Sequence, residues 1–384
     1  MLRSPKYTPR WLIPSTPLFR RLLSDFALHQ ARKSSDEEDD PKYRIRKQDP
    51  EGQYLHLHKS KGQHILTNPR VLDVIVRRAG VGPTDTVLEV GPGTGNLTLK
   101  LLGAALRVVA VEIDRRMVDV LIKRVEDRGF GDKLTVIQRD ALKAEFPPFD
   151  VVVANIPYGI SSPLVAKLVY GPNQFRNATL LLQKEFARRL LANPGDSEYN
   201  RLAVNVKLVA DVELVMDVSK RDFVPVPKVD SSVVIIRPKA EVPAVDLNEW
   251  WAFTRTCFGK KNKTLGATFK QKRKLMEIFK TSKTTSYRTG ESSCGFGEEE
   301  GVDCGEESEG EDCCPVLSVS EGEIGLFREK VVSVLRLDGF EDKRPSKLSN
   351  DELLHLLGQL NGAGIYFHGR GQLHITEDAT LAAT

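Results

Sequence analysis

The sequence predicts a doubly wound α/β domain with a parallel sheet, followed by a small helical domain. Between residues 69 and 154, short apolar runs typical of buried strands alternate with segments of helical spacing. This alternation is the pattern of a parallel sheet whose strands are joined by crossover helices. After Pro238 helical spacing continues without a further strand pattern. A chain of 384 residues is long enough for two such domains.

The elements of the α/β domain are predicted in the following order. A first helix is expected at 69–79, and helices between the early strands are expected at 97–102 and 116–124. Strands are predicted at 86–90, 108–111, 134–137, 151–154, 180–182, 204–209 and 232–236. Because a doubly wound sheet binds ligands at the carboxyl ends of its strands, the residues just after these strands are the candidates for a functional site.

The helical domain is predicted from three helices at 250–258, 263–279 and 327–335. Ser349 and Glu352 form a capping box in front of a further apolar helix. The predicted organisation is 1–52 as a basic arm and charged linker, 53–240 as the α/β domain, 241–368 as the helical domain with an acidic loop at about 285–322, and 369–384 as a tail.

The body of the chain is basic. Residues 291–312 contain ten acids and no base, and without these acids the net charge rises from +4 to +14. A basic body suits a polyanionic partner, although charged segments are often simply solvated. The predicted RNA-binding residues are Lys59, Lys61, Arg255, Lys260, Lys261, Lys263, Lys270, Lys272, Arg273 and Lys274. The last eight form a tract without an acid, and the alternative for it is a solvated basic helix.

The amino-terminal segment predicts the compartment. Residues 1–24 contain five bases, interspersed serine and threonine, and no acid, which is typical of an organellar presequence. The alternative is a basic arm that contacts RNA. Because no apolar run reaches about 18 residues, no membrane-spanning helix is expected. The five cysteines form no Cys-Xaa-Xaa-Cys pair, so neither a disulfide framework nor a metal site is expected.

A glycine-rich turn follows the first predicted strand. Gly91, Gly93 and Gly95 allow a backbone to approach a nucleotide-like ligand where side chains would obstruct it. Asn96 stands where the dinucleotide fingerprint has glycine, so pyrophosphate binding is not expected. The alternative is an ordinary strand-to-helix turn.

Two carboxylates follow the next two strands. Glu112 ends the second strand, where it can accept both ribose hydroxyls, and Asp140 follows the third, where it can accept the amine of an adenine. Taken alone, Glu112 could cap a helix and Asp140 could form a turn. Together with the glycine-rich turn, their order favours an adenosine-containing methyl donor, S-adenosylmethionine.

The tetrapeptide Asn155, Ile156, Pro157, Tyr158 follows the strand at 151–154. The Asn155 side-chain oxygen and the Ile156 carbonyl can accept the hydrogens of a planar amine, Pro157 fixes the bend, and Tyr158 can stack on a flipped base. The sequence therefore predicts amine methylation at this edge of the sheet. Phe223 is the candidate for the opposite face of the base, with an ordinary core phenylalanine as its alternative.

These motifs also resemble a known family, the small-subunit ribosomal RNA adenine N6,N6-dimethyltransferases of the eukaryotic branch. The resemblance spans about residues 56–367 and includes the motifs at 59–66, 91–95, 155–158, 223–232, 255–265 and 343–349. It implies a Rossmann-like, S-adenosylmethionine-dependent methyltransferase domain. The cofactor contacts that it implies are His64, Leu66, Gly91, Glu112, Asp140 and Asn155.

The resemblance implies dimethylation of two adjacent adenosines near the 3′ end of small-subunit ribosomal RNA, on a pre-ribosomal small subunit, by a monomer. The basic arm favours a mitochondrial member. The alternatives are a dimethylase of cytosolic 18S ribosomal RNA in the nucleolus or cytoplasm, a DNA or free-base amine methyltransferase, and a non-catalytic assembly or mitochondrial transcription factor with a methyltransferase fold.

Overall fold

The chain divides into two compact units. A computed structural model describes residues 46–48, 54–56, 63–289 and 320–369. The first unit consists of Met1–Asn193 and Ser197–Pro243, and the second of Pro194–Asp196 and Ala244–Thr384. Among the described residues, no helix is both long and apolar enough to cross a membrane.

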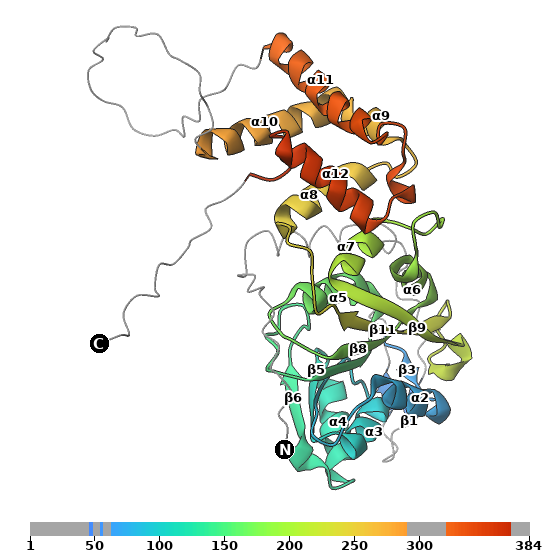
Figure 1. The fold of residues 1–384 in the computed structure, drawn as a ribbon. Helices are drawn as coiled ribbons and strands as arrows, with labels where there is room; N and C mark the ends of the chain where they lie inside the picture. Colours follow the sequence, from blue (N-terminus) through green and yellow to red (C-terminus); the bar gives the residue numbers. More distant parts are fainter. Residues whose placement is uncertain (1–45, 49–53, 57–62, 290–319, 370–384) are drawn as a thin grey trace, which may run out of the picture. The chain divides into compact units, whose positions relative to one another are not determined.

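The first unit is built on a seven-stranded sheet in the order β6-β5-β4-β7-β8-β11-β9 (Figure 1). These strands are β4 (Thr86–Val90), β5 (Arg107–Glu112), β6 (Leu134–Gln138), β7 (Val151–Asn155), β8 (Asn177–Gln183), β9 (Ala210–Val218) and β11 (Ser231–Pro238). Two smaller pairs join β3 (Ile65–Leu66) to β10 (Phe223–Val224) and β1 (Arg46–Gln48) to β2 (Tyr54–His56).

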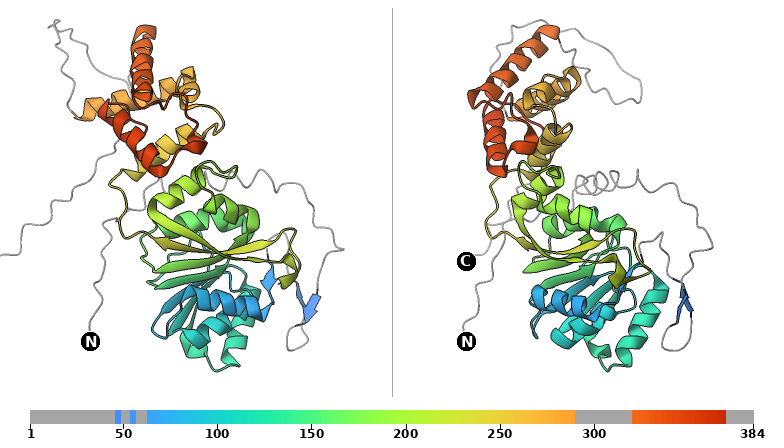
Figure 2. Two further views of the ribbon diagram at one scale, coloured as in Figure 1. Left: turned by 45° about the vertical axis from the view of Figure 1, so that its right-hand side comes forward. Right: turned by 90° about the vertical axis from the view of Figure 1, so that its right-hand side faces the viewer.

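Helices cover both faces of the seven-stranded sheet (Figure 2). One layer contains α2 (Pro69–Ala79), α3 (Asn96–Ala104) and α4 (Arg115–Glu126), and the other contains α5 (Ser161–Tyr170), α6 (Lys184–Leu191) and α7 (Arg201–Val209). The central strands β4 and β7 are buried on both faces, so their sequences are mainly apolar rather than alternating, with Glu89 as the ionisable exception in β4. This burial explains why both strands could be predicted from the sequence.

The sheet differs from the prediction in one respect, because it is not wholly parallel. β4, β5, β6, β7 and β8 are parallel, whereas β11 runs antiparallel to both of its neighbours, β8 and β9. A parallel pair requires a crossover connection, usually a helix. Between β9 and β11 the chain contains only the short turn η5 (Lys220–Asp222) and β10, so it returns beside β9 in the opposite direction.

The predicted strand at 204–209 is wrong. These residues lie in α7, and the strand begins only at Ala210. Asn200 caps the helix, since its side chain accepts from the backbone N–H groups of Leu202 and Ala203. Within 204–209 the polar Asn205 and Lys207 alternate with Val204, Val206 and Leu208, which is the period of a strand, although nearly all of the helix is buried.

The second unit is helical. Its elements are α8 (Leu247–Phe258), α9 (Leu265–Phe269), α10 (Lys272–Thr289), α11 (Glu321–Leu337), the turn η6 (Pro345–Lys347) and α12 (Asn350–Gly362). The capping box of Ser349 and Glu352 is confirmed. The helix predicted at 263–279 is in fact two helices. The N–H groups of Leu265 and Gly266 donate to the carbonyls of Lys343 and Glu341, a distant contact that no local pattern reports.

Candidate active site

The candidate site lies where the strand order of the sheet reverses. β5 lies on one side of β4 and β7 on the other, and doubly wound sheets bind ligands at the carboxyl ends of strands at such a switch point. The glycine-rich turn at 91–95 follows β4, and residues 155–158 follow β7. A Cβ atom on Gly91 would lie 3.4 Å from the Asn155 carbonyl oxygen. The two motifs are therefore direct neighbours.

The glycine-rich turn has a backbone that only glycine adopts readily. Gly91, Gly93 and Gly95 have φ angles of 71°, 56° and 85°. The Gly91 N–H donates to the carbonyl of Val111 at the end of β5, 2.9 Å away. A Cβ atom on Gly95 would lie 2.6 Å from Leu121 Cδ1. The turn thus brings α3 close to α4 and leaves bare backbone at the edge of the sheet.

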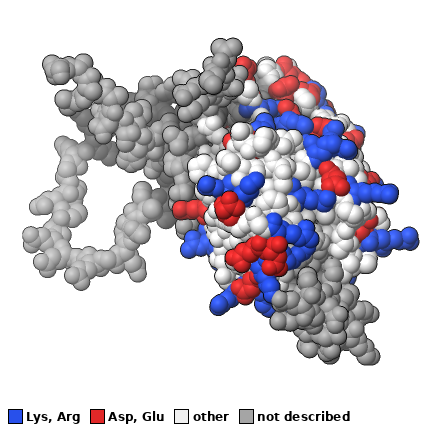
Figure 3. All heavy atoms as spheres, turned by 90° about the horizontal axis from the view of Figure 1, so that it is seen from below, with Lys and Arg blue, Asp and Glu red and all other residues white. Residues whose placement is uncertain are grey.

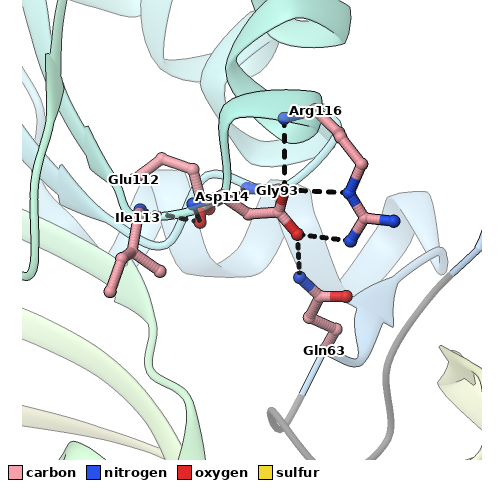
Figure 4. Close-up of polar contacts among 6 residues, drawn as sticks. All are labelled: Gln63, Gly93, Glu112, Ile113, Asp114 and Arg116. Atoms are coloured by element: carbon pink, nitrogen blue, oxygen red, sulfur yellow. Dashed lines mark hydrogen bonds and ion pairs between the residues drawn. The ribbon is translucent and has the colours of Figure 1, made fainter.

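Glu112 is held beside this turn by backbone donors (Figure 4). Its Oε1 accepts from the N–H groups of Ile113 and Asp114, each at 2.9 Å, and its Oε2 accepts from the Gly93 N–H at 3.4 Å. The residue is 8% exposed, and this burial raises the pKa of its carboxyl, while the backbone donors oppose the rise. The carboxylate is therefore fixed between the β4 and β5 loops.

A second carboxylate orders the same loop. Asp114 caps α4 and pairs with Arg116, and it also accepts from Gln63 Nε2 at 2.8 Å (Figure 4). Hydrogen bonding to Arg116 lowers the pKa of Asp114 to about 2. The Gln63 contact joins residues that are far apart in the sequence, and it fastens the chain before β3 to the loop that carries Glu112.

Asp140 lies beyond β6, at the same edge of the sheet. Its Oδ1 accepts from the Leu142 N–H at 2.9 Å, which forms a tight turn. Because β4, β5 and β6 are parallel neighbours, the glycine-rich turn, Glu112 and Asp140 follow three adjacent strand ends. The structure therefore brings these predicted cofactor residues to a common edge.

The side-chain amide of Asn155 has a defined orientation. Its Nδ2 donates to the His64 carbonyl at 3.0 Å, and among the described residues no hydrogen bond is made to its Oδ1. The Ile156 N–H donates to the Leu181 carbonyl of β8 at 3.2 Å, and the Ile156 side chain is buried. These contacts fix the start of the tetrapeptide and leave the amide oxygen as an acceptor.

Tyr158 and His64 form the aromatic part of the site. Their rings are stacked with centroids 5.7 Å apart and an interplanar angle of 28°. The Tyr158 hydroxyl lies 3.1 Å from Ser231 Oγ, and His64 Nδ1 lies 2.8 Å from the Pro225 carbonyl oxygen. Burial raises the pKa of Tyr158, so its hydroxyl stays protonated around neutral pH. The stacked pair is therefore fixed at the Tyr158 hydroxyl by Ser231 and at the His64 ring by the Pro225 carbonyl.

Leu66 and Phe223 lie beneath the site rather than in its opening. They pair across β3 and β10 and are 4% and 1% exposed, as members of one hydrophobic core. The Leu66 carbonyl accepts from Asn96 Nδ2 at 2.9 Å. The ring of Phe223 thus has no open face for a base in this structure, which favours the alternative of a core phenylalanine. Its contribution is to hold β3, and with it His64.

Some residues of the site were missed by the sequence analysis. Glu89, two residues before Gly91, is 1% exposed, and its Oε2 has no hydrogen-bond partner among the described residues. Burial raises the pKa of its carboxyl to about 8. The signal was present, because Glu89 is the only ionisable side chain in the apolar strand β4. Asn96 and Arg124 were also missed, and they tie the glycine-rich turn to β3 and α4.

The basic tract of the second unit is divided among several elements rather than placed on one helix. Arg255 lies in α8, Lys260 to Lys263 lie between α8 and α9, and the remaining bases lie after α9 or in α10. Three of these lysines have acidic partners, namely Lys270 with Glu341, Lys272 with Glu321 and Lys274 with Glu277. The exposed bases are Arg255, Lys260, Lys263, Lys272 and Arg273.

Several predicted residues and segments lie outside the described part of the chain. They are Lys59, Lys61, the presequence-like arm, the tail and most of the acidic loop. Within the described residues, no group of acidic, cysteine or histidine side chains is arranged to hold a metal ion. On the face seen from below in Figure 3, basic and acidic side chains are interspersed, so that face is not a surface of one charge.

Comparisons with known proteins agree with this geometry. Residues 55–287 match the family described as ribosomal RNA adenine dimethylase. The chain is 63% identical over 321 residues to a mitochondrial ribosomal RNA small subunit methyltransferase of Arabidopsis thaliana, covering 82% of this chain and 81% of that protein. It is 47% identical over 327 residues to another ribosomal RNA small subunit methyltransferase of that plant, covering 82% and 93%.

A solved structure gives the same result for the fold. A dimethyladenosine transferase from Plasmodium falciparum is 38% identical, with a TM-score of 0.67, and the match covers 79% of this chain and 99% of that one. The predicted fold class, a Rossmann-like methyltransferase domain followed by a small helical domain, is confirmed. From the family match over more than half of its length and from these relatives, the chain belongs to the ribosomal RNA adenine dimethylase family.

Proposed function

We propose that the protein uses S-adenosylmethionine to dimethylate the N6 amine of two adjacent adenosines near the 3′ end of mitochondrial small-subunit ribosomal RNA. The observation that carries this proposal is the orientation of Asn155. Its amide nitrogen is committed to the His64 carbonyl, so its oxygen is presented as an acceptor next to the glycine-rich turn. An acceptor so placed suits an amine that is to be methylated.

The residues at the strand ends fit the proposed cofactor. Glu112 is a fixed carboxylate for the ribose hydroxyls, and Asp140 is an acceptor for the adenine amine. The buried Glu89 has an unpartnered oxygen, which is the kind of group that a cationic amine would satisfy. When bound, S-adenosylmethionine supplies an electrophilic methyl group on its sulfonium. The tasks of the protein are therefore to bind, to orient and to exclude water.

Orientation is the main requirement of this reaction. The exocyclic nitrogen of adenine is a weak nucleophile because its lone pair is delocalised into the ring. Asn155 Oδ1 and the Ile156 carbonyl would accept the two amine hydrogens, which holds the nitrogen lone pair, perpendicular to the ring plane, toward the methyl group and reduces its delocalisation into the ring. Positioning of this kind contributes up to about 7–11 kcal/mol in intramolecular models. The nitrogen loses one proton with each transfer, and the second transfer must proceed with a single amine hydrogen left to orient it.

Tyr158 is the proposed stacking surface for the flipped adenine. One face of its ring is occupied by His64, so the base would stack on the other face. Because Ser231 and Pro225 hold the two rings, the stacking surface is in place before RNA binds. Because the two side chains are already fixed, less side-chain conformational entropy is lost when the base binds.

The second unit is proposed to bind the RNA backbone. The exposed bases Lys260, Lys263 and Arg273 can neutralise phosphates, which strengthens binding without reading sequence. Selection of the two adenosines must then come from RNA shape and from the base site. The mitochondrial assignment is supported by the name of the Arabidopsis relative and by the basic character of residues 1–24.

The test is to map dimethyladenosine in mitochondrial and cytosolic small-subunit RNA after loss of the protein. Loss of the two modifications in the mitochondrial RNA alone is expected. If only the cytosolic RNA loses them, the substrate is wrong, and if neither does, the activity is wrong. Transfer to duplex DNA but not to RNA by the purified protein would favour the DNA alternative. Restoration of small-subunit assembly by an inactive Asn155→Ala variant would reveal a non-catalytic role as well.

A further inference from the structure

Lys167 contacts three backbone carbonyls with its ammonium group. It is the only charged residue of α5, the helix that begins three residues after Tyr158. Its Nζ donates to the backbone carbonyls of Ala141 at 2.8 Å, Leu142 at 3.3 Å and Ala144. An ammonium group has three hydrogens, and the three carbonyls take all of them. Lys167 therefore acts here as a brace and not as a proton acceptor.

The braced segment is the turn that begins at Asp140. The carboxylate of Asp140 accepts from the Leu142 N–H. The backbone carbonyl of Asp140 accepts from the N–H groups of Lys143 at 2.9 Å and Ala144 at 2.8 Å. Leu142 is therefore bonded to the Asp140 carboxylate, and Ala144 is bonded to the Asp140 backbone. Two of the three carbonyls bound by Lys167 belong to those same residues. The direction of the Asp140 side chain consequently depends on a helix of the neighbouring β7 crossover.

The surroundings keep the ammonium in place. Its Nζ lies 4.1 Å from the centroid of the Phe146 ring, a cation–π contact from the end of the same turn. Burial lowers the pKa of Lys167 to about 8, while Asp140 and Glu145 favour its charged form. The side chain is thus mainly charged at neutral pH, although it is half removed from water.

We infer that Lys167 is a positioning residue for adenine recognition, which holds Asp140 in line with the exocyclic amine of the cofactor's adenine. This inference rests on the proposed function, since it assumes that Asp140 accepts that amine. It also gives α5 two tasks, because the helix follows the tetrapeptide at 155–158 at one end and braces the cofactor turn through Lys167. The cofactor site and the base site would then share one rigid element.

The chain contains a matched control. Lys207 of α7 makes the same kind of contact, with its Nζ 2.8 Å from the carbonyls of Leu191 and Ala192 and from Asn193 Oδ1. That segment follows α6 and contains no predicted site residue. Lys207→Met therefore removes three similar hydrogen bonds from the same unit without touching the Asp140 turn.

The test is calorimetric binding of S-adenosylhomocysteine and S-inosylhomocysteine to the full chain, its Lys167→Met variant and its Lys207→Met variant. The inosyl compound carries an oxygen in place of the amine, so the ratio of the two dissociation constants reports adenine recognition. We expect Lys167→Met to reduce that ratio at least tenfold and Lys207→Met to leave it within twofold of the unaltered chain. A purely structural role would lower both affinities together and leave the ratio unchanged.

Equal ratios in the two variants would overturn the inference while leaving the proposed function intact. Failure of the unaltered chain to bind S-adenosylhomocysteine would instead overturn the proposed function. If Lys167→Met does not fold, Lys167→Arg replaces it, because a guanidinium keeps the charge but cannot direct three donors to the same three carbonyls. A reduction of the ratio by at least threefold is expected for that variant, and an unchanged ratio would contradict the inference.

Discussion

The Nδ2 atom of Asn155 donates to the carbonyl of His64 across a distance of 3.0 Å, although the two residues are 91 positions apart. This contact leaves Oδ1 as the amide atom that would accept the substrate amine under the proposed function. It also joins the end of β7 to the residue before β3, so that one hydrogen bond fixes both the Asn155 side chain and the position of His64.

Replacement of Asn155 separates chemistry from binding. Asn155→Ala removes the proposed acceptor but none of the cofactor carboxylates, so methyl transfer should fall at least about a hundredfold. The affinity for S-adenosylhomocysteine should stay within a few-fold. Single-turnover transfer to small-subunit RNA and calorimetric binding measure the two effects. Unchanged transfer by Asn155→Ala would remove the proposed role of the amide.

Gly95 is a site where alanine should be costly. A left-handed backbone costs alanine about 1–2 kcal/mol, and overpacking against Leu121 adds about 1–3 kcal/mol. Gly80 is the control, since it has a φ of 61° but no atom within 4 Å of an added Cβ. Denaturant unfolding should therefore show a larger loss for Gly95→Ala than for Gly80→Ala. Equal losses would mean that α4 moves aside without cost.

Glu89 predicts a pH dependence of stability in the cofactor-free protein. Burial raises its pKa from 4.5 to about 8, so the folded state holds a proton that the unfolded state releases. The stability from this group is complete below pH 4.5 and is lost as the pH rises towards about 8. Relative to Glu89→Gln, the unaltered chain should lose at most about 1.4 kcal/mol per pH unit in that window.

The measurement is the free energy of unfolding at several pH values between 5 and 8 for both proteins. Glu126→Gln, which changes an exposed carboxylate at the end of α4, serves as the control and should follow the unaltered chain. Parallel curves for Glu89→Gln and the unaltered chain would show that Glu89 is charged in the folded state.

The basic residues of the second unit predict a salt effect on RNA binding. Each phosphate contact contributes about 0.7–0.9 to the slope of log affinity against log salt. Lys260→Ala combined with Lys263→Ala should reduce that slope by about this amount per lost contact. Lys274→Ala should change it little, because Lys274 already pairs with Glu277 at 2.7 Å. Filter binding of small-subunit RNA across a salt series provides the test, and an unchanged slope in the double variant would exclude these lysines as phosphate contacts.

The elements that depend on local sequence pattern could mostly be predicted. β4 and β7 were predictable because strands buried on both faces are short apolar runs, and the glycine-rich turn was predictable because positive φ angles demand glycine. The same reasoning failed at 204–209, where Asn205 and Lys207 alternate with apolar residues at the period of a strand, although the segment is helical. Periodicity over six residues therefore does not separate a strand from a buried helix.

What the sequence could not report are contacts between distant segments. The pairing of Gln63 with Asp114, the bridge of Asn96 to the Leu66 carbonyl and the brace from Lys167 all join residues more than twenty positions apart. Each involves a polar side chain whose local sequence is equally compatible with solvent exposure. Tertiary packing alone selects the partner.

The pairing of β3 with β10 has a consequence for the order in which the protein is made. β3 is among the earliest described parts of the chain, but its partner strand begins only at Phe223. A ribosome that has synthesised the glycine-rich turn, Glu112 and Asn155 has not yet supplied the strand that fastens His64 and Leu66. The segment that carries His64 and Leu66 is therefore fixed only late in the translation of the first unit, and a chain that stops short of Phe223 would contain the motifs after β4, β5 and β7 without the β3–β10 pair.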